Sequence, residues 1–177
     1  MTVFFTADPH FGHAPIIGHC DRPFGDATEM DRTIIRNWNS VVGPRDEVWV
    51  VGDFWCGKPK DKGQADAVFR RLNGSKHLIA GNHDSNHVRA LPWASVRDGC
   101  AVVTTEDTTV VAFHYPMRSW PHAAHGAIHV YGHVHGRIPP DSRSCDVGVD
   151  VWDFTPVTVA RIKERLAASP PSVGYAG

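Results

Sequence analysis

The chain has 177 residues, of which 42% are hydrophobic and 21% charged, a composition typical of a globular domain with a sizeable core. Its formal net charge of -1 argues against strong binding of duplex nucleic acid, which requires a basic excess. No apolar run reaches the ~18 residues of a membrane-spanning helix, and the first residues lack the basic flank of a signal peptide. We therefore expect a cytoplasmic protein that does not enter membranes and keeps its four cysteines as free thiols.

The first half of the chain predicts strands that alternate with helices. Asp26, followed three residues later by a glutamate, is typical of a helix N-terminus, and apolar residues then recur at helical spacing until Gly43-Pro44. A second helix is expected over residues 64–72. The segment 11–24 is too irregular in its Gly, Pro and His content to be assigned. Short buried strands are expected over residues 2–7, 47–51 and 77–80.

The second half predicts a hairpin, two further strands and a terminal helix. The hairpin turns at Glu106-Asp107, residues 117–126 form a loop, and residues 158–168 form the helix. Residues 169–177 are expected to be a flexible tail. We thus predict a single α/β domain over residues 1–168. The strands of this half are expected over residues 100–105, 108–113, 127–131 and 145–151.

Polar residues follow five of these strands, at the point where each strand ends. Open α/β sheets place their sites at the carboxyl ends of their strands, so we expect these side chains to converge. Each motif alone is equally typical of a turn, and only their occurrence together indicates a site. The motifs are Asp8-Pro9-His10, Gly52-Asp53, Gly81-Asn82-His83-Asp84, His114 and Gly132-His133-Val134-His135.

Seven of these side chains are candidate metal ligands, through an oxygen or an imidazole nitrogen. Seven ligands exceed what one tetrahedral ion needs and fit two ions that share a carboxylate, whose two oxygens can serve two cations. Mixed imidazole and oxygen ligands favour Mn, Fe, Zn, Co or Ni over Ca or Mg. The expected cofactor is therefore a pair of divalent transition metal ions. The seven candidates are Asp8, His10, Asp53, Asn82, His114, His133 and His135.

Several residues near the motifs are weaker candidates. Arg22 and Arg118 lie in loops from which a guanidinium could contact substrate phosphate, although a solvated arginine is the commoner case. Tyr115 could stack on a base or an aryl group, or anchor its loop by partial burial. Asp150 follows a strand and could support a ligand histidine. Three histidines fit either the mouth of the site or the surface: His13, His122 and His125.

The order of these motifs resembles the calcineurin-like metallophosphoesterases. The resemblance spans residues 8–135, and five motifs in one order are a specific signal. Flanking residues such as Phe11-Gly12-His13 and Gly148-Val149-Asp150-Val151 are similar to small stand-alone bacterial and phage members. The resemblance implies a four-layer αββα sandwich, in which two mixed β-sheets pack face to face and helices flank them.

The resemblance also implies a role for each motif residue. His83 would donate a hydrogen bond to the phosphate or a proton to the leaving group, and Asp84 would orient His83. Manganese is the first expected metal. One ion would be held by Asp8, His10 and His135, the other by Asn82, His114 and His133, with Asp53 as the bridge.

The implied function is a phosphodiesterase that acts on small or nucleotide-derived substrates, by in-line attack of a metal-bridging hydroxide. The same motifs also serve phosphomonoesterases, including protein phosphatases, and nucleases. A non-catalytic binding module on the same scaffold is a further alternative. His83 argues against it, because the similar binding module of this fold lacks the catalytic histidine. The expected partner is a phosphate ester, and the sequence does not specify an oligomeric state.

Overall fold

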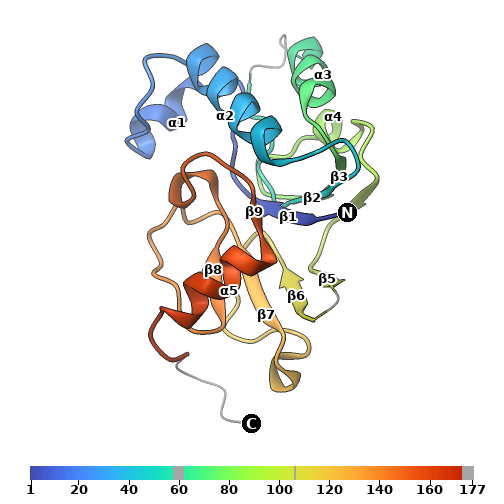
Figure 1. Cartoon of the computed structure of the whole chain (residues 1–177). Helices are drawn as coiled ribbons and strands as arrows, with labels where there is room; N and C mark the ends of the chain where they lie inside the picture. Colours follow the sequence, from blue (N-terminus) through green and yellow to red (C-terminus); the bar gives the residue numbers. More distant parts are fainter. Residues whose placement is uncertain (58–61, 106, 173–177) are drawn as a thin grey trace.

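The computed structural model describes residues 1–57, 62–105 and 107–172, and its strands form two sheets (Figure 1). The first sheet has the strand order β4-β3-β2-β1-β9, and the second has the order β5-β6-β7-β8. The first sheet comprises β1 (Val3–Thr6), β2 (Glu47–Val50), β3 (Ser75–Ile79), β4 (Ser95–Arg97) and β9 (Val157–Thr158). The second comprises β5 (Ala101–Thr104), β6 (Thr109–Ala112), β7 (Ile128–Tyr131) and β8 (Ser144–Asp146).

Each sheet combines parallel and antiparallel pairs. Strands β1 to β4 are parallel to one another, and β9 joins β1 in the antiparallel direction. In the second sheet β6, β7 and β8 are parallel, and β5 is antiparallel to β6. Parallel strands end at one edge of a sheet, so the loops after β1, β2 and β3 lie together, as do those after β6 and β7. The predicted architecture of two mixed sheets with flanking helices is confirmed.

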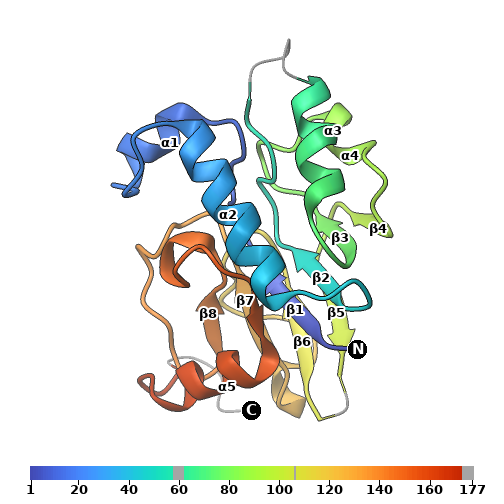
Figure 2. The same ribbon diagram turned by 45° about the horizontal axis from the view of Figure 1, so that its top comes forward.

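Helices α2 and α3 cover the outer face of the first sheet (Figure 2). Asp26 caps α2 as predicted, because its carboxylate accepts the Glu29 N–H at 2.9 Å. Helix α1, helix α4, β4 and β9 were not predicted, since six residues or fewer show no readable periodicity. The helices are α1 (Ala14–His19), α2 (Ala27–Val41), α3 (Lys62–Arg71), α4 (Asn86–Arg89) and α5 (Val159–Ala167).

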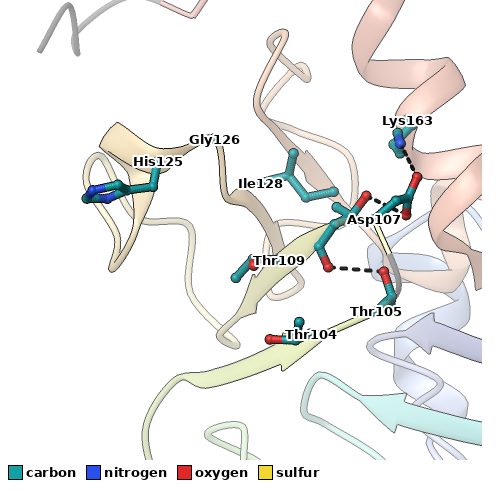
Figure 3. Close-up of a pocket in the computed structure, with 9 residues that line it drawn as sticks. Thr104, Thr105, Asp107, Thr109, His125, Gly126, Ile128 and Lys163 are labelled. Carbon is teal, nitrogen blue, oxygen red and sulfur yellow. Dashed lines mark hydrogen bonds and ion pairs between the residues drawn. The ribbon is translucent and has the colours of Figure 1, made fainter.

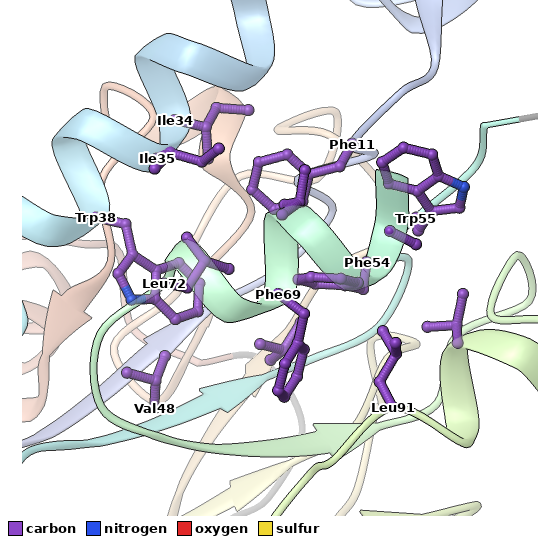
Figure 4. Close-up of a cluster of buried hydrophobic side chains, with 14 of the residues drawn as sticks. Phe11, Ile34, Ile35, Trp38, Val48, Phe54, Trp55, Phe69, Leu72 and Leu91 are labelled. Carbon is purple, nitrogen blue, oxygen red and sulfur yellow. The ribbon is translucent and has the colours of Figure 1, made fainter. Parts of the chain in front are cut away.

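The first sheet contributes alternate residues to two separate cores. Val48 and Leu78 point toward the helices and pack with Trp38 and Phe69 (Figure 4). Their neighbours in sequence point toward the second sheet, where Phe5 packs with the inner side chains of β6 and β7. Helix α5 also buries its apolar stripe in this second core. The first sheet is therefore buried on both faces, which fixes the positions of the loops at its edge.

One predicted boundary differs from the structure, and two predictions concern residues that the structure does not describe. The predicted strand 145–151 ends at Asp146, because the chain turns to pair Gly148 with Ala7 and then forms a 3₁₀ turn over Val149–Val151. Glu106 at the predicted hairpin turn, and residues 173–177 of the predicted tail, lie outside the described residues.

In the ranges that the structure describes, no helix is long and apolar enough to cross a membrane.

Candidate metal centre

Backbone hydrogen bonds continue past the strand ends and join the two sheets. The Asp8 N–H donates to the Gly52 carbonyl at 3.0 Å, and the His10 N–H donates to the Asp53 carbonyl at 3.0 Å. Across the sheets, the Ala7 N–H donates to the Val147 carbonyl at 3.0 Å. The two edges that carry the polar motifs therefore meet, and the motifs face one another.

Five of the seven candidate ligands have left-handed backbone conformations, which non-glycine residues avoid. They lie in the loops that follow the strands β1, β2 and β7. Such strain persists only where the surrounding structure over-determines it, and it concentrates at functional sites. The five φ angles are 54° for Asp8, 51° for His10, 55° for Asp53, 69° for His133 and 48° for His135.

The candidate ligands form two groups, which we call the inner half and the outer half. The inner half consists of Asp8, His10 and His135, whose ligand atoms lie within 4.8 Å of one another. Those of Asp53, His114 and His133 also lie within 4.8 Å of one another. We define the outer half as Asn82, His114 and His133, because Asp53 lies between the two groups.

Asp53 faces both halves with a single oxygen. Its Oδ2 atom is 3.5 Å from His10 Nε2 and 3.6 Å from His114 Nε2. Its Oδ1 atom instead accepts the His83 N–H at 2.9 Å. The Oδ2 atom thus faces both halves, while the Oδ1 atom is hydrogen-bonded to the loop backbone.

Several hydrogen-bond acceptor atoms face one another in this site with no donor between them. His114 Nδ1 donates to the Val51 carbonyl at 3.0 Å, which leaves Nε2 of a neutral ring unprotonated and 3.0 Å from Asn82 Oδ1. In the inner half, Asp8 Oδ1 and His10 Nε2 are buried and have no hydrogen-bond partner among the described residues. Acceptors facing acceptors are unfavourable unless a cation lies between them, so this donor set fits divalent metal ions.

Electrostatics in the inner half point the same way. Burial, together with Asp146 and Asp53, raises the pKa of Asp8 well above its ordinary value. Burial and the neighbouring His135 lower the pKa of His10 to about 2. Both pKa shifts arise because the charged forms of Asp8 and His10 are unfavourable where water is excluded. Divalent cations would offset the carboxylate repulsion and bind the neutral imidazole.

Arg22 is buried and paired with protein groups, so it is neither the free guanidinium nor the solvated side chain that the sequence suggested. Its side chain is fully buried and pairs with both oxygens of Asp150, at 2.7 and 2.9 Å. It also donates to the carbonyls of Asp8 and Pro9, at 2.8 and 3.0 Å. Asp150 in turn accepts from His135 Nδ1 at 2.8 Å, so the contact predicted for Asp150 is present. Arg22 thus connects both motifs of the inner half.

Asp84 has partners other than the His83 ring that we expected it to orient. Its carboxylate accepts the backbone N–H groups of Gly81, Asp53 and Phe54, at 2.8, 2.9 and 2.9 Å. Asp84 therefore ties the loop after β2 to the loop after β3. The His83 side chain is exposed, and its ring centroid lies 5.4 Å from that of His10.

Tyr115 lies at the rim of the outer half. Its ring centroid is 4.7 Å from that of His133, and its hydroxyl is 3.5 Å from Asn82 Oδ1. Arg118 lines a separate hollow with Trp120 and Tyr131. This places Tyr115, more directly than Arg118, where a substrate bound at the outer half would pass.

Two of the weaker histidine candidates occupy different ends of the molecule. His13 lies against His10, with their Nδ1 atoms 3.3 Å apart. His125 lines a pocket with Thr104, Thr109 and Lys163 (Figure 3). That pocket lies where β6 and β7 begin, at the opposite end of these strands from His114 and His133. His125 is therefore not at the mouth of the site.

Sequence reasoning missed two carboxylates that hold the site loops. Both oxygens of Asp31 accept the Gly12 N–H at 3.1 Å, and Asp146 accepts the N–H groups of Gly136 and Gly148, at 2.8 and 2.6 Å. Asp31 had a readable signal, because it lies on the apolar stripe of α2, where a carboxylate needs a buried partner. Asp146 had none beyond its place at the end of a strand.

Comparisons with known proteins identify the family of the chain. The sequence profile described as calcineurin-like phosphoesterase matches residues 1–103, more than half of the chain. The uncharacterized protein MJ1445 of Methanocaldococcus jannaschii is 32% identical over 171 residues, which cover 93% of this chain and 90% of that protein. The gene 66 protein of Mycobacterium phage D29 is 30% identical over 192 residues, which cover 90% of this chain and 94% of that protein.

A solved structure has the same fold. The Aquifex aeolicus protein of unknown function AQ665 superimposes with a TM-score of 0.74 at 22% identity, covering 92% of this chain and 98% of that one. At this identity the likeness shows the fold alone. The profile match carries the assignment further: this chain belongs to the calcineurin-like phosphoesterases, a family of metal-dependent phosphoric ester hydrolases.

Proposed function

We propose that this protein is a phosphodiesterase that hydrolyses small or nucleotide-derived phosphodiesters with two transition metal ions, manganese first among them. The observation that carries the proposal is the position of Asp53 Oδ2, 3.5 Å from His10 Nε2 and 3.6 Å from His114 Nε2. An oxygen placed between two imidazole nitrogens supports a shared ligand of two cations.

In this proposal the inner half holds one ion, the outer half holds the other, and Asp53 binds both. Such an ion pair, when bound, polarises phosphoryl oxygens and supplies hydroxide at neutral pH. The exposed ring of His83 next to His10 supports a role as donor to the phosphate or to the leaving oxygen. Asp84 contributes by fixing the backbone of the loop that carries His83.

The preference for diesters is supported by the openness of the mouth. Asn82, His83, Tyr115 and His133 are all exposed there, so substituents on both sides of a phosphate have room. Phosphomonoesters, phosphoproteins and nucleic acids are the competing substrates, and a non-catalytic binding role is the competing function. We also propose a cytoplasmic location, which the four free cysteines support.

The proposal is tested by hydrolysis of bis(p-nitrophenyl) phosphate beside p-nitrophenyl phosphate, with added Mn²⁺ and with a chelator. We expect faster diester hydrolysis, which the chelator and the Asp53→Asn substitution both abolish. Faster monoester hydrolysis would refute the diesterase assignment and keep the metal centre. Stoichiometric metal binding without hydrolysis of either substrate would favour the binding module, and the absence of bound metal would refute the centre itself.

A further inference from the structure

His13 is held against His10 by a rigid loop. The Gly12 N–H donates to both oxygens of Asp31, and the His13 N–H donates to the His10 carbonyl at 3.1 Å. Gly12 has a φ of 73°, and a Cβ at this position would lie 2.7 Å from the Trp55 ring. The His13 side chain makes no capping hydrogen bond to α1, which it precedes. Its contact is instead with His10, whose ring stacks on it with centroids 5.3 Å apart.

The position of one proton follows from these contacts. His10 turns Nε2 toward Asp53 and Nδ1 toward His13 Nδ1, 3.3 Å away. If His10 binds a metal ion through Nε2, its proton must be on Nδ1. A hydrogen bond between two nitrogens contains one proton, so His13 Nδ1 must then be the acceptor. A neutral His13 consequently carries its own proton on Nε2.

His10 differs in this respect from His114 and His135, two other candidate metal ligands whose Nδ1 atom has a hydrogen-bond partner. His114 Nδ1 donates to the Val51 carbonyl, and His135 Nδ1 donates to the Asp150 carboxylate. Neither of these oxygen acceptors carries a proton of its own. A neutral imidazole acceptor does, and that proton must be on its second nitrogen. His13 Nε2 has no hydrogen-bond partner in the part of the chain that the structure describes, and the His13 and His83 rings lie 6.3 Å apart.

We propose that His13 is a positioning residue that keeps the His10 proton on Nδ1 and, when the inner ion is bound, presents an Nε2–H group to the substrate phosphate beside His83. The inference rests on the proposed metal centre. Binding of the inner ion would thereby turn His13 into a phosphate donor, so that anion binding at the mouth depends on metal occupancy.

The first test reads the tautomer directly. Long-range ¹H–¹⁵N correlation spectra of histidine-labelled protein distinguish a protonated Nδ1 from a protonated Nε2. Zn²⁺ is the suitable probe, because it is diamagnetic. We expect His13 to be protonated on Nε2 alone in the zinc-loaded protein, with its signals assigned by their loss in His13→Asn. Protonation of His13 on Nδ1 in that state would refute the inference.

The second test separates the two roles with matched variants. His13→Asn retains an acceptor near the position of Nδ1, whereas His13→Phe retains only the ring. We expect zinc affinity of the inner half to fall about 10- to 100-fold in His13→Phe and to stay near wild type in His13→Asn. Binding of inorganic phosphate to the zinc-loaded protein should weaken about 3- to 10-fold in His13→Asn, which lacks the Nε2 donor.

The outcomes distinguish failure of the inference from failure of the proposed function. His125→Phe is the control for replacing a histidine with a phenylalanine. His125 lies before the start of β7, whereas the candidate ligands His133 and His135 follow its end. Equal melting temperatures of the metal-free variants would show that folding is unaffected. If wild type binds zinc and His13→Phe binds it equally well, the inference is wrong and the metal centre stands. If wild type binds neither zinc nor manganese, the proposed function is wrong.

Discussion

The inner and outer halves of the candidate metal centre differ in how the protein supports them. Asp8 and His10 are buried, and the inner half is surrounded by Arg22, Asp150 and His13. In the outer half His114 is buried, but Asn82 and His133 are exposed beside Tyr115. A buried donor set with fixed partners is preorganised for its ion, whereas exposed ligands must be ordered when the ion binds. We therefore expect the inner half to bind more tightly and the outer half to exchange its ion faster.

Removal of the shared oxygen should have the largest effect, because it damages both halves at once. Asp53→Asn replaces the anionic Oδ2 that faces His10 and His114 with a neutral group. We expect hydrolysis to fall by at least about 10³-fold, since metal stabilisation of the transition state is worth several kcal/mol. Activity and bound manganese should be measured together, with Asp107→Asn as a surface control. Full activity with one bound ion would contradict the prediction, because one half of the centre would then be enough for hydrolysis.

Loss of the buried arginine should damage the inner half alone. Arg22→Met leaves the buried Asp150 carboxylate with only its His135 partner and the carbonyls of Asp8 and Pro9 without donors. We expect the free energy of unfolding to fall by about 3–5 kcal/mol. Affinity for the first ion should fall about 10- to 100-fold. Urea denaturation and metal titration measure the two effects, and the exposed Arg118→Met serves as the control. An equal loss in both ion-binding steps would contradict the separation into halves.

Asp8 should destabilise the protein when the metal is absent. Because its folded pKa is raised, protonated Asp8 favours the folded state, and this stability is lost as pH rises from the unfolded pKa toward the folded one. Asp8→Asn should therefore raise the free energy of unfolding of chelator-treated protein by roughly 1–3 kcal/mol at neutral pH. The gain should vanish in acid, where wild-type Asp8 is protonated too. With manganese present the sign should reverse, and an Asp8→Asn protein that is less stable in both states would contradict the electrostatic account.

A ligand of the outer half can be removed with little effect on folding. Asn82 is exposed, so Asn82→Ala should change the free energy of unfolding by less than about 0.5 kcal/mol. The second ion should bind about 10-fold more weakly, and the first should bind as in wild type. Isothermal titration resolves the two steps. Weaker binding of the first ion would mean that the halves are coupled more strongly than their burial indicates.

The smallest effect is expected at the rim. Tyr115→Phe keeps the ring contact with His133 and removes the hydroxyl that lies 3.5 Å from Asn82. We expect the KM for a phosphodiester to rise about 2- to 5-fold with little change in kcat. Steady-state kinetics measure this split, and a lower kcat at unchanged KM would place Tyr115 in the chemical step.

The strand-end motifs were predictable because their placement depends on local rules. A buried strand followed by Gly52-Asp53 or by Gly132-His133 presents its polar residue at the edge shared by all parallel strands. The expected contact of Asp150 with a candidate ligand histidine, His135, is present, although Asp150 lies in a 3₁₀ turn and does not follow a strand. Element boundaries followed wherever periodicity extended over several turns, as in α2.

The partners of Arg22 and Asp84 were not predictable, because they depend on burial between distant segments. Arg22 is 128 residues from Asp150, and nothing local to its loop distinguishes a buried clamp from a solvated side chain. For Asp84, the family resemblance implied a contact with the His83 side chain. The turn at this position instead directs the carboxylate to backbone N–H groups of two other loops. Such contacts are fixed by the assembled sheets and not by spacing.

The spread of the donors over both sheets has a consequence for the order in which the protein forms. The donors extend from Asp8 to His135, so each half of the centre needs residues from both sheets. A chain still leaving the ribosome, or one cut before β7, cannot assemble either half. Bound ion therefore stabilises the completed chain alone, by about 1.4 kcal/mol for each tenfold excess over its dissociation constant. The supply of metal would then govern how long finished molecules survive proteolysis, without helping incomplete ones to fold.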